Sequence, residues 1–184
     1  MPRRLAALFA AAALLLGSGL HVAAEDLFPD LIALGPYQVV NTAGFTTDAD
    51  GERENLPTDL RSVEVLLDLT RDRTVMVLTL ETMRLTLPRL WNGLAAVDWG
   101  GSGAITLRRE DILTLTGKKA LEDVDTFGAR IDWPGIGPAT LVLFEAGGGS
   151  FAGFLVSKPG GRTIVRQMEA HRYFASRPRA ARGR

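Results

Sequence analysis

The spacing of apolar residues in this chain is that of β-strands, with a repeat of two residues. Ser62–Thr70 carries valine or leucine at alternate positions, with Glu64 and Asp68 on the opposite face. Thr126–Trp133 repeats the pattern, and its polar positions Arg130 and Asp132 are predicted to face outward. The residues predicted to face inward in these two runs are Val63, Val65, Leu67, Leu69, Phe127, Ala129, Ile131 and Trp133.

The most distinctive stretch is Asp125–Phe174, in which strand-like runs are joined by glycine-rich turns. These turns are typical of hairpins that require positive φ, and none resembles a phosphate-binding loop, because none precedes a helix or a Gly-Lys-Ser/Thr sequence. The predicted strands are Thr126–Trp133, Thr140–Glu145 continued by Phe151–Ser157, and Thr163–Phe174, and the predicted turns are 134–138, 147–150 and 158–161.

The earlier half predicts further strands and very little helix. Thr74–Leu87 reads as one long central strand, preceded by a tight hairpin at residues 71–73. Lys118–Val124 is predicted to be a helical turn or a loop, and a helix is considered only near Asp26–Leu34. The pattern therefore predicts an all-β fold, an antiparallel β-sandwich or partly open barrel of about seven to eight strands. The remaining predicted short strands are Tyr37–Asn41, Ala95–Trp99, Ala104–Arg108 and Asp111–Thr116.

The first 24 residues have the features of a secretory signal peptide. Arg3 and Arg4 precede the apolar run Leu5–Leu16, and small residues stand before a predicted cleavage at Glu25. The run is short against the roughly 20 residues that span a bilayer, so no membrane span is expected after cleavage. We therefore expect a periplasmic or secreted protein, with a signal peptide at residues 1–24 and a single β-rich domain at residues 25–174.

Composition adds two points to this picture. The chain has no cysteine, so an exported domain of this size must be stabilised by its core rather than by disulfides.

Residues 172–184 contain five arginines and no acidic residue. An arginine-rich end at 175–184 is predicted to be disordered and solvated, although contact with an anionic surface is an alternative. We expect no nucleic-acid partner.

The acidic loop Thr46–Asp59 is the segment predicted to be most mobile. Within it, Asp48, Asp50 and Glu52 alternate as the ligands of a calcium site do, because closely spaced carboxylates can converge on a hard cation. The EF-hand pattern requires glycine at its sixth position, where this chain has Arg53. A solvated Asp-Gly turn is the competing interpretation, and calcium is the one cofactor considered.

Candidate chemistry is otherwise scarce. His171 is the only histidine beyond the predicted signal, and Ser150 lies in a hairpin sequence that lacks the last glycine of a nucleophile elbow. No catalytic residue is therefore assigned. Trp91 and Trp99 are the candidate binding residues, since exposed tryptophans can line a sugar or peptide groove, and Trp91 is expected to be the more exposed.

The C-terminal half has a recurrent succession of strand-like runs and glycine turns at residues 128–131, 139–143, 150–154 and 160–166. This succession resembles the β-rich propeptide of secreted reprolysin-type zinc metalloproteases, and the resemblance extends over residues 60–174 at most. Ile164 replaces the tyrosine usual in the last hairpin of that family. The resemblance implies a folding-assistant or inhibitory module that docks on a partner, here a protease in a separate chain.

Together these observations predict an exported, non-catalytic β-domain that acts as a binding, assembly or inhibitor-like module in the cell envelope. Its partner would be another envelope or secreted protein, docked on an edge strand. The alternative is a small secreted hydrolase that uses carboxylates, with calcium at the acidic loop. A structural envelope protein with an anchoring arginine-rich end is a third reading.

Overall fold

The computed structural model describes residues 30–81, 83–98, 107–133 and 135–173. The chain divides into two compact units, residues 1–31 and 32–184, and almost all described residues belong to the second. The predicted signal peptide, the arginine-rich end at 175–184 and Trp99 lie outside the described residues.

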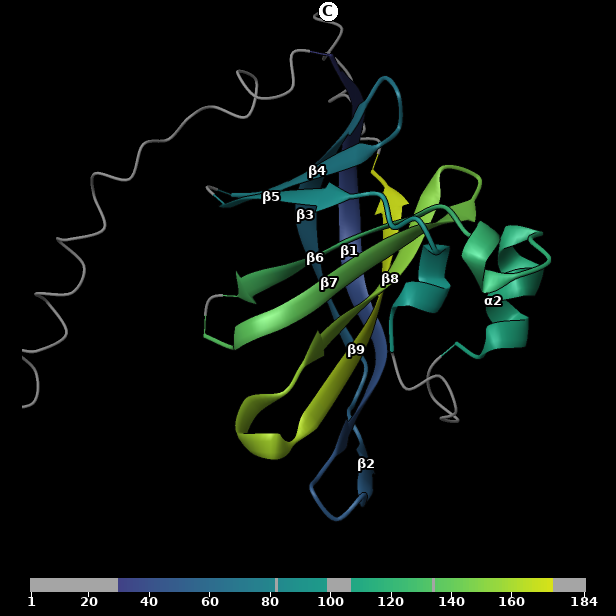
Figure 1. The fold of residues 1–184 in the computed structure, drawn as a ribbon. Helices are drawn as coiled ribbons and strands as arrows, with labels where there is room; N and C mark the ends of the chain where they lie inside the picture. Colours follow the sequence, from purple (N-terminus) through teal and green to yellow (C-terminus); the bar gives the residue numbers. More distant parts are fainter. Residues whose placement is uncertain (1–29, 82, 99–106, 134, 174–184) are drawn as a thin grey trace, which may run out of the picture. The chain divides into compact units, whose positions relative to one another are not determined.

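One antiparallel sheet dominates the second unit, as the all-β prediction requires (Figure 1). Eight strands follow each other in the order β5-β4-β3-β1-β9-β8-β7-β6, and β2 pairs with the far end of β1. The strands are β1 (Leu31–Thr47), β2 (Arg53–Asn55), β3 (Asp59–Thr70), β4 (Val75–Leu80), β5 (Met83–Pro88), β6 (Thr126–Trp133), β7 (Gly137–Gly147), β8 (Ser150–Ser157) and β9 (Thr163–Arg172).

The sheet curls until its two edge strands almost meet. An isolated antiparallel bridge joins Arg89 to Phe127, and the backbone N–H of Leu90 donates to the carbonyl oxygen of Thr126 at 2.8 Å. These contacts connect the end of β5 to the start of β6, so the sheet is a nearly closed barrel of eight strands. Of the two predicted architectures, the partly open barrel is the one that forms.

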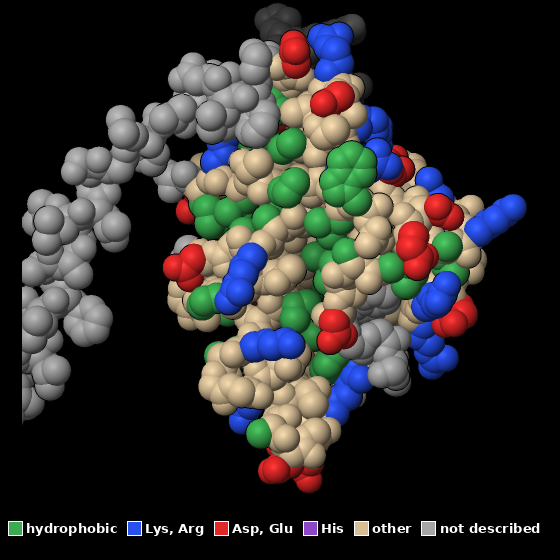
Figure 2. Space-filling model, viewed as in Figure 1, with side chains coloured by type: hydrophobic (Ala, Val, Ile, Leu, Met, Phe, Trp, Pro, Cys, Tyr) green, Lys and Arg blue, Asp and Glu red, His purple; other side chains and the backbone are tan. Residues whose placement is uncertain are grey.

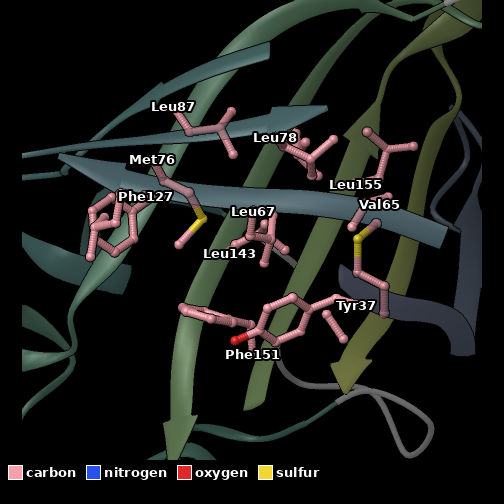
Figure 3. Packing of buried hydrophobic residues seen from close by; sticks show 14 of the residues in the cluster. Tyr37, Val65, Leu67, Met76, Leu78, Leu87, Phe127, Leu143, Phe151 and Leu155 are labelled. Atoms are coloured by element: carbon pink, nitrogen blue, oxygen red, sulfur yellow. The ribbon is translucent and has the colours of Figure 1, made fainter. Parts of the chain in front are cut away.

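The inside of the barrel is an apolar core built from alternate residues of β1 and β3 to β9. Side chains from these strands point toward one another, as Figure 3 shows for ten labelled residues. Val65, Leu67 and Leu69 are buried there, which confirms the inward face predicted for β3. Phe127 is buried in the same cluster and the other predicted inward residues of β6 pack against it, while Arg130 and Asp132 are exposed.

A second apolar layer covers the outside of the barrel over β7, β8, β9 and β1. It is formed by the helix α2 (Arg109–Thr116) and two 3-10 turns, η1 (Gly93–Ala96) and η2 (Leu121–Asp123). Ile112 of α2, Leu94 of η1 and Leu121 of η2 are buried against the outward-facing side chains of the strands. The strands they cover are therefore apolar on both faces, which explains the unbroken apolar run Phe151–Val156 within β8. The strand residues of this layer are Phe45, Val142, Phe144, Ala152, Phe154, Val156 and Val165.

The glycine turns behave as predicted. Gly147, Gly148 and Gly149 between β7 and β8 have φ values of +92°, +62° and +76°. Gly160 and Gly161 in the turn η3 (Pro159–Gly161), before β9, have φ values of +58° and +80°. L-residues with a Cβ rarely adopt this region, so the turns depend on glycine.

Several predicted strand boundaries were wrong. The single strand Thr74–Leu87 is two strands, because Glu81 adopts a φ of +50° and the chain reverses between β4 and β5. The short strand Tyr37–Asn41 is only the middle of β1, which pairs along its length with β9 and β2. The acidic loop is largely a hairpin: β1 runs to Thr47, and β2 returns alongside it.

Three element types were also wrong. Asp111–Thr116 is helical, because the carboxylate of Asp111 accepts the Arg108 backbone N–H at 3.0 Å and Gly117 ends the helix with a φ of +67°. Ala95–Trp99 overlaps the 3-10 turn η1, and Leu31–Leu34 is strand rather than helix. Residues 104–106 of the strand predicted at Ala104–Arg108 lie outside the described residues, and Leu107 and Arg108 are not in a strand. Of the helical turn and the loop predicted as alternatives for Lys118–Val124, the helical turn forms, as η2.

Among the described residues, no helix has the length and apolar character needed to cross a bilayer.

Candidate functional site

The core of the barrel is not completely filled. A cavity of about 240 Å³ lies inside it, and its lining comes from β1, β3, β4, β6, β7, β8 and β9 together with Ile136 of the β6–β7 turn. An eight-stranded barrel has an interior wide enough for packed side chains or for one small ligand. The apolar lining residues are Val39, Val63, Val65, Leu67, Leu78, Leu80, Trp133, Ile136, Leu141, Leu143, Leu155, Met168 and Ala170, and the polar ones are Asn41, Arg61 and Arg166.

One end of the barrel is closed by aromatic rings. Tyr37 is buried, and its hydroxyl donates a hydrogen bond of 2.9 Å to the carbonyl oxygen of Gly149. The ring of Phe151 packs edge-to-face against Tyr37, with ring centroids 5.7 Å apart. These side chains occupy the end of the barrel where β9 finishes and β8 begins (Figure 3).

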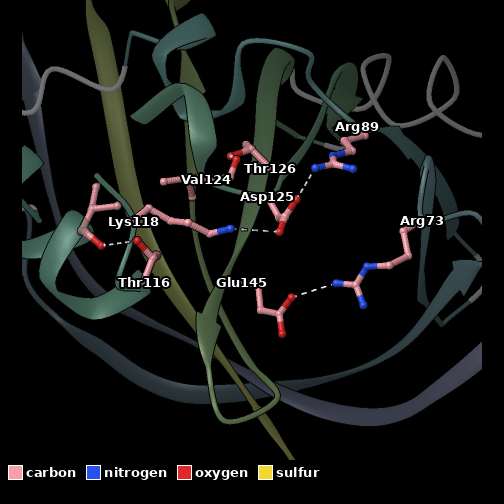
Figure 4. Close-up of polar contacts among 9 residues, drawn as sticks. Arg73, Arg89, Thr116, Lys118, Val124, Asp125, Thr126 and Glu145 are labelled. Carbon is pink, nitrogen blue, oxygen red and sulfur yellow. Dashed lines mark hydrogen bonds and ion pairs between the residues drawn. The ribbon is translucent and has the colours of Figure 1, made fainter. Parts of the chain in front are cut away.

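Ion pairs link the loops around this closed end (Figure 4). Arg73, in the β3–β4 turn, pairs with Glu145 of β7 at 2.9 Å. Arg89 pairs with Asp125 beside the β5–β6 bridge, and Lys118 lies 3.7 Å from the same carboxylate. The Arg73–Glu145 and Arg89–Asp125 pairs connect the half of the barrel that carries β3 to β5 with the half that carries β6 and β7. Being exposed, each contributes little on its own.

The other end of the cavity reaches the surface. Val63 on β3 and Ile136 in the β6–β7 turn line the cavity and yet are 46% and 43% exposed. Figure 2 shows hydrophobic side chains on the face that it presents, several of them over β4 and β5, with both basic and acidic side chains around them. We call the open end, lined by Val63, Ile136, Asn41, Arg61 and Arg166, the mouth.

Two arginines lie at the mouth. Arg166 is the register partner of Leu155 and belongs to the row of β9 residues, with Met168 and Ala170, that lines the cavity. Its guanidinium donates to the carbonyl oxygen of Pro57 at 3.0 Å. The guanidinium of Arg61 binds both carboxylate oxygens of Asp59, at 3.0 and 2.8 Å.

Both arginines affect the pKa of Asp59. Hydrogen bonds from Arg61 lower the pKa of Asp59 from 3.8 to about 2, and the charge of Arg166 contributes in the same direction. Two positive charges therefore face one negative charge at the mouth.

The sequence-predicted site residues lie elsewhere. Trp91 is 96% exposed, as expected, in the segment that follows β5. Asp48, Asp50 and Glu52 lie in the β1–β2 turn, where Asp48 accepts the backbone N–H groups of Asp50 and Glu52 at 3.0 and 2.8 Å. Within the described residues, no three His, Cys, Asp or Glu side chains are grouped so that they could hold a metal ion. Calcium binding stays a prediction.

Ser150 and His171 lie close together in the structure, although no sequence pattern pairs them. The Ser150 hydroxyl lies 3.4 Å from Nδ1 of His171, and Nε2 of His171 lies 3.1 Å from the Glu169 carboxylate. Their strand neighbours Phe151 and Ala170 point into the barrel core, so Ser150 and His171 point outward. The barrel cavity is on the other face of the sheet, and the ring of His171 is largely exposed to water.

The mouth arginines were missed, although the sequence contains a signal for each of them. Arg166 alternates with Met168 and Ala170, so the repeat of two residues that predicts an inward face for these residues also places an arginine inside the barrel. A charged residue at an inward position is unfavourable unless it has a partner or reaches water. Arg61 carries the same signal, because it alternates with the inward residues Val63 and Val65 of β3.

Comparison with protein-family models, with curated proteins and with solved structures gave no significant match. The resemblance of residues 60–174 to reprolysin propeptides stays a prediction.

Proposed function

We propose that this protein is a non-catalytic binding protein that holds one small apolar or amphipathic molecule inside its barrel. The observation that carries the proposal is the cavity of about 240 Å³, whose lining is apolar except at its mouth. Ligand sites are typically concave and apolar, with a few polar groups that fix the orientation of the ligand. The cavity has this arrangement.

The size of the cavity limits the size of the ligand. A dry apolar cavity of about 150 Å³ binds benzene, so the barrel cavity is large enough for about ten non-hydrogen atoms. Its opening at Val63 and Ile136 gives such a molecule a route from solvent. A linear or flat molecule of this size fits the proposal, whereas a folded polypeptide does not.

The proposal includes the export of the protein, which is predicted from the signal peptide at residues 1–24. A carrier outside the inner membrane would hold a sparingly soluble molecule in water and release it to a second envelope or secreted protein. That partner role continues the binding module expected from the sequence, and the edge strands β5 and β6 remain its predicted docking surface.

Calorimetry with 1-octanol, an uncharged molecule of suitable size, tests the proposal. We expect one molecule to bind per chain and to raise the melting temperature, because a ligand that binds only the folded state stabilises it. The variant Val63→Trp should abolish binding, since the larger side chain fills the mouth at a half-exposed position where it costs little stability.

Leu66→Trp is the matched control. Leu66 lies on the same strand and is 48% exposed, against 46% for Val63, but it does not line the cavity. The control should bind 1-octanol as the wild type does. Equal binding by Val63→Trp, or no binding by the wild type, would contradict the proposal.

A further inference from the structure

The polar residues of the cavity all lie at its mouth. Arg166 extends from β9 beside Leu155 and Arg61 from β3 beside Val63, while Asn41 of β1 is the register partner of Met168. A molecule whose tail fills the cavity therefore has its other end next to two guanidinium groups and one amide. The cavity is thus asymmetric, with an apolar interior and a cationic opening.

The charges at the mouth are only partly compensated. Asp59 is bound by Arg61 through both carboxylate oxygens, while Arg166 donates to the neutral carbonyl of Pro57. A guanidinium carries five N–H donors, and the bond to Pro57 uses one of them. A carboxylate placed at the mouth would gain charge-assisted hydrogen bonds, which are about twice as strong as neutral ones.

We propose that the ligand is an anionic amphiphile, a medium-length hydrocarbon chain that ends in a carboxylate, with its tail in the barrel and its head group bound by Arg166 and Arg61. This inference rests on the proposed function and adds the chemical class of the ligand. The chain length follows from the cavity volume, which has room for about ten carbon atoms.

The geometry disfavours the other head groups. A cationic head group would lie next to two arginines and only one carboxylate, and the like charges would repel each other. A neutral hydroxyl head can accept a hydrogen bond from a guanidinium group, but it carries no opposite charge and therefore gains less than a carboxylate. An anionic head also competes with Asp59 for Arg61, so binding should weaken the pair that holds the pKa of Asp59 low.

Calorimetry at neutral pH with three ligands of equal chain length tests the inference: decanoate, 1-decanol and decyltrimethylammonium. We expect decanoate to bind about tenfold more tightly than 1-decanol, which corresponds to about 1.4 kcal/mol, and the cation to bind more weakly than either. Raising the salt concentration should reduce the preference, because exposed charges are screened.

Variants identify the groups responsible. Arg61→Met and Arg166→Met should each reduce the preference for decanoate over 1-decanol, and the double variant should remove it while 1-decanol still binds. Arg130→Met is the matched control, because Arg130 is an exposed arginine on the outer face of β6 and should leave the preference unchanged. Retained binding of 1-decanol by each variant shows that the barrel is folded.

The outcomes separate this inference from the proposed function. If 1-decanol and decanoate bind equally and the arginine variants change nothing, the cavity binds ligands but the anionic head group is wrong. If neither ligand binds the wild type, the proposed function fails as well. A preference for the cationic ligand would overturn the inference directly.

Discussion

The hydroxyl of Tyr37 donates a hydrogen bond to the carbonyl oxygen of Gly149, across 112 residues of sequence. Tyr37 lies on β1 and Gly149 in the turn between β7 and β8, so the bond reaches past β9 and ties this turn to β1 at the closed end of the barrel. Tyr37 therefore both fills the closed end of the barrel and holds the β7–β8 turn in place.

Tyr37→Phe should destabilise the protein by about 1–3 kcal/mol, because it keeps the ring but removes the donor to a partly buried carbonyl. Chemical unfolding of the variant and the wild type measures the loss. Tyr173→Phe, at an exposed position at the end of the described chain, is the control and should be close to neutral. An unchanged stability for Tyr37→Phe would show that the hydrogen bond does not form.

Gly153→Ala should be severely destabilising. A Cβ at Gly153 would lie 2.1 Å from the carbonyl oxygen of Val142 on the neighbouring strand, and a backbone atom cannot move aside without breaking the β7–β8 pairing. Gly148→Ala is the comparison, because Gly148 has a φ of +62° and open space around it, so only the backbone strain of about 1 kcal/mol applies. Melting curves should rank Gly153→Ala well below Gly148→Ala, and the reverse order would contradict the close approach of the strands.

Asp59 should titrate at a pKa of about 2, below its ordinary value of 3.8, because Arg61 binds its carboxylate. The stabilising effect of this pair is complete above the ordinary value and is lost as the pH falls through about 2, although solvent exposure keeps it small. The carboxyl ¹³C shift of Asp59 followed by NMR measures the pKa directly. In Arg61→Met the pKa should rise toward 3.8, and a pKa that stays near 2 would assign the shift to another group.

Asp72→Ala should lower the melting temperature at neutral pH. In the β3–β4 turn, Asp72 accepts hydrogen bonds from the hydroxyls of Thr70 and Thr74 at 2.6 and 2.8 Å, and these bonds lower the pKa of its carboxyl. The lowered pKa means that the contribution is present above the ordinary pKa and disappears on acidification. Melting curves from neutral pH down to pH 2 should therefore converge for the variant and the wild type. Asp50→Ala, in the β1–β2 turn, serves as a control, and an Asp72 effect that does not depend on pH would point to a cause other than the carboxylate.

Ser150 should not behave as an activated nucleophile. Its distance of 3.4 Å from His171 is long for proton transfer, and both face solvent on the side of the sheet away from the cavity. Incubation with a fluorophosphonate followed by intact mass measurement should show no adduct. Stoichiometric labelling that is lost in His171→Ala would instead indicate a serine nucleophile, which the sequence pattern does not predict.

The sequence determined the local structure of the strands and turns. A repeat of two residues specifies an inner and an outer face, so the buried faces of β3 and β6 followed from Ser62–Thr70 and Thr126–Trp133. Glycines with positive φ marked the turns around β8, because few other residues adopt that conformation. The helix α2 was missed because Leu113 and Leu115 alternate with polar residues, as the residues of a half-buried strand do. Asp111 and Gly117 nevertheless carry the capping signals of a helix.

Only the tertiary structure decided that the sheet curls into a barrel and leaves a cavity. Closure depends on the twist of the strands and on a single bridge between Arg89 and Phe127, which are 38 positions apart and share no sequence pattern. The cavity depends on how side chains from seven strands fill the interior, which no local pattern records. The mouth likewise exists only because β3 and β9 place Arg61 and Arg166 at the same end of the barrel.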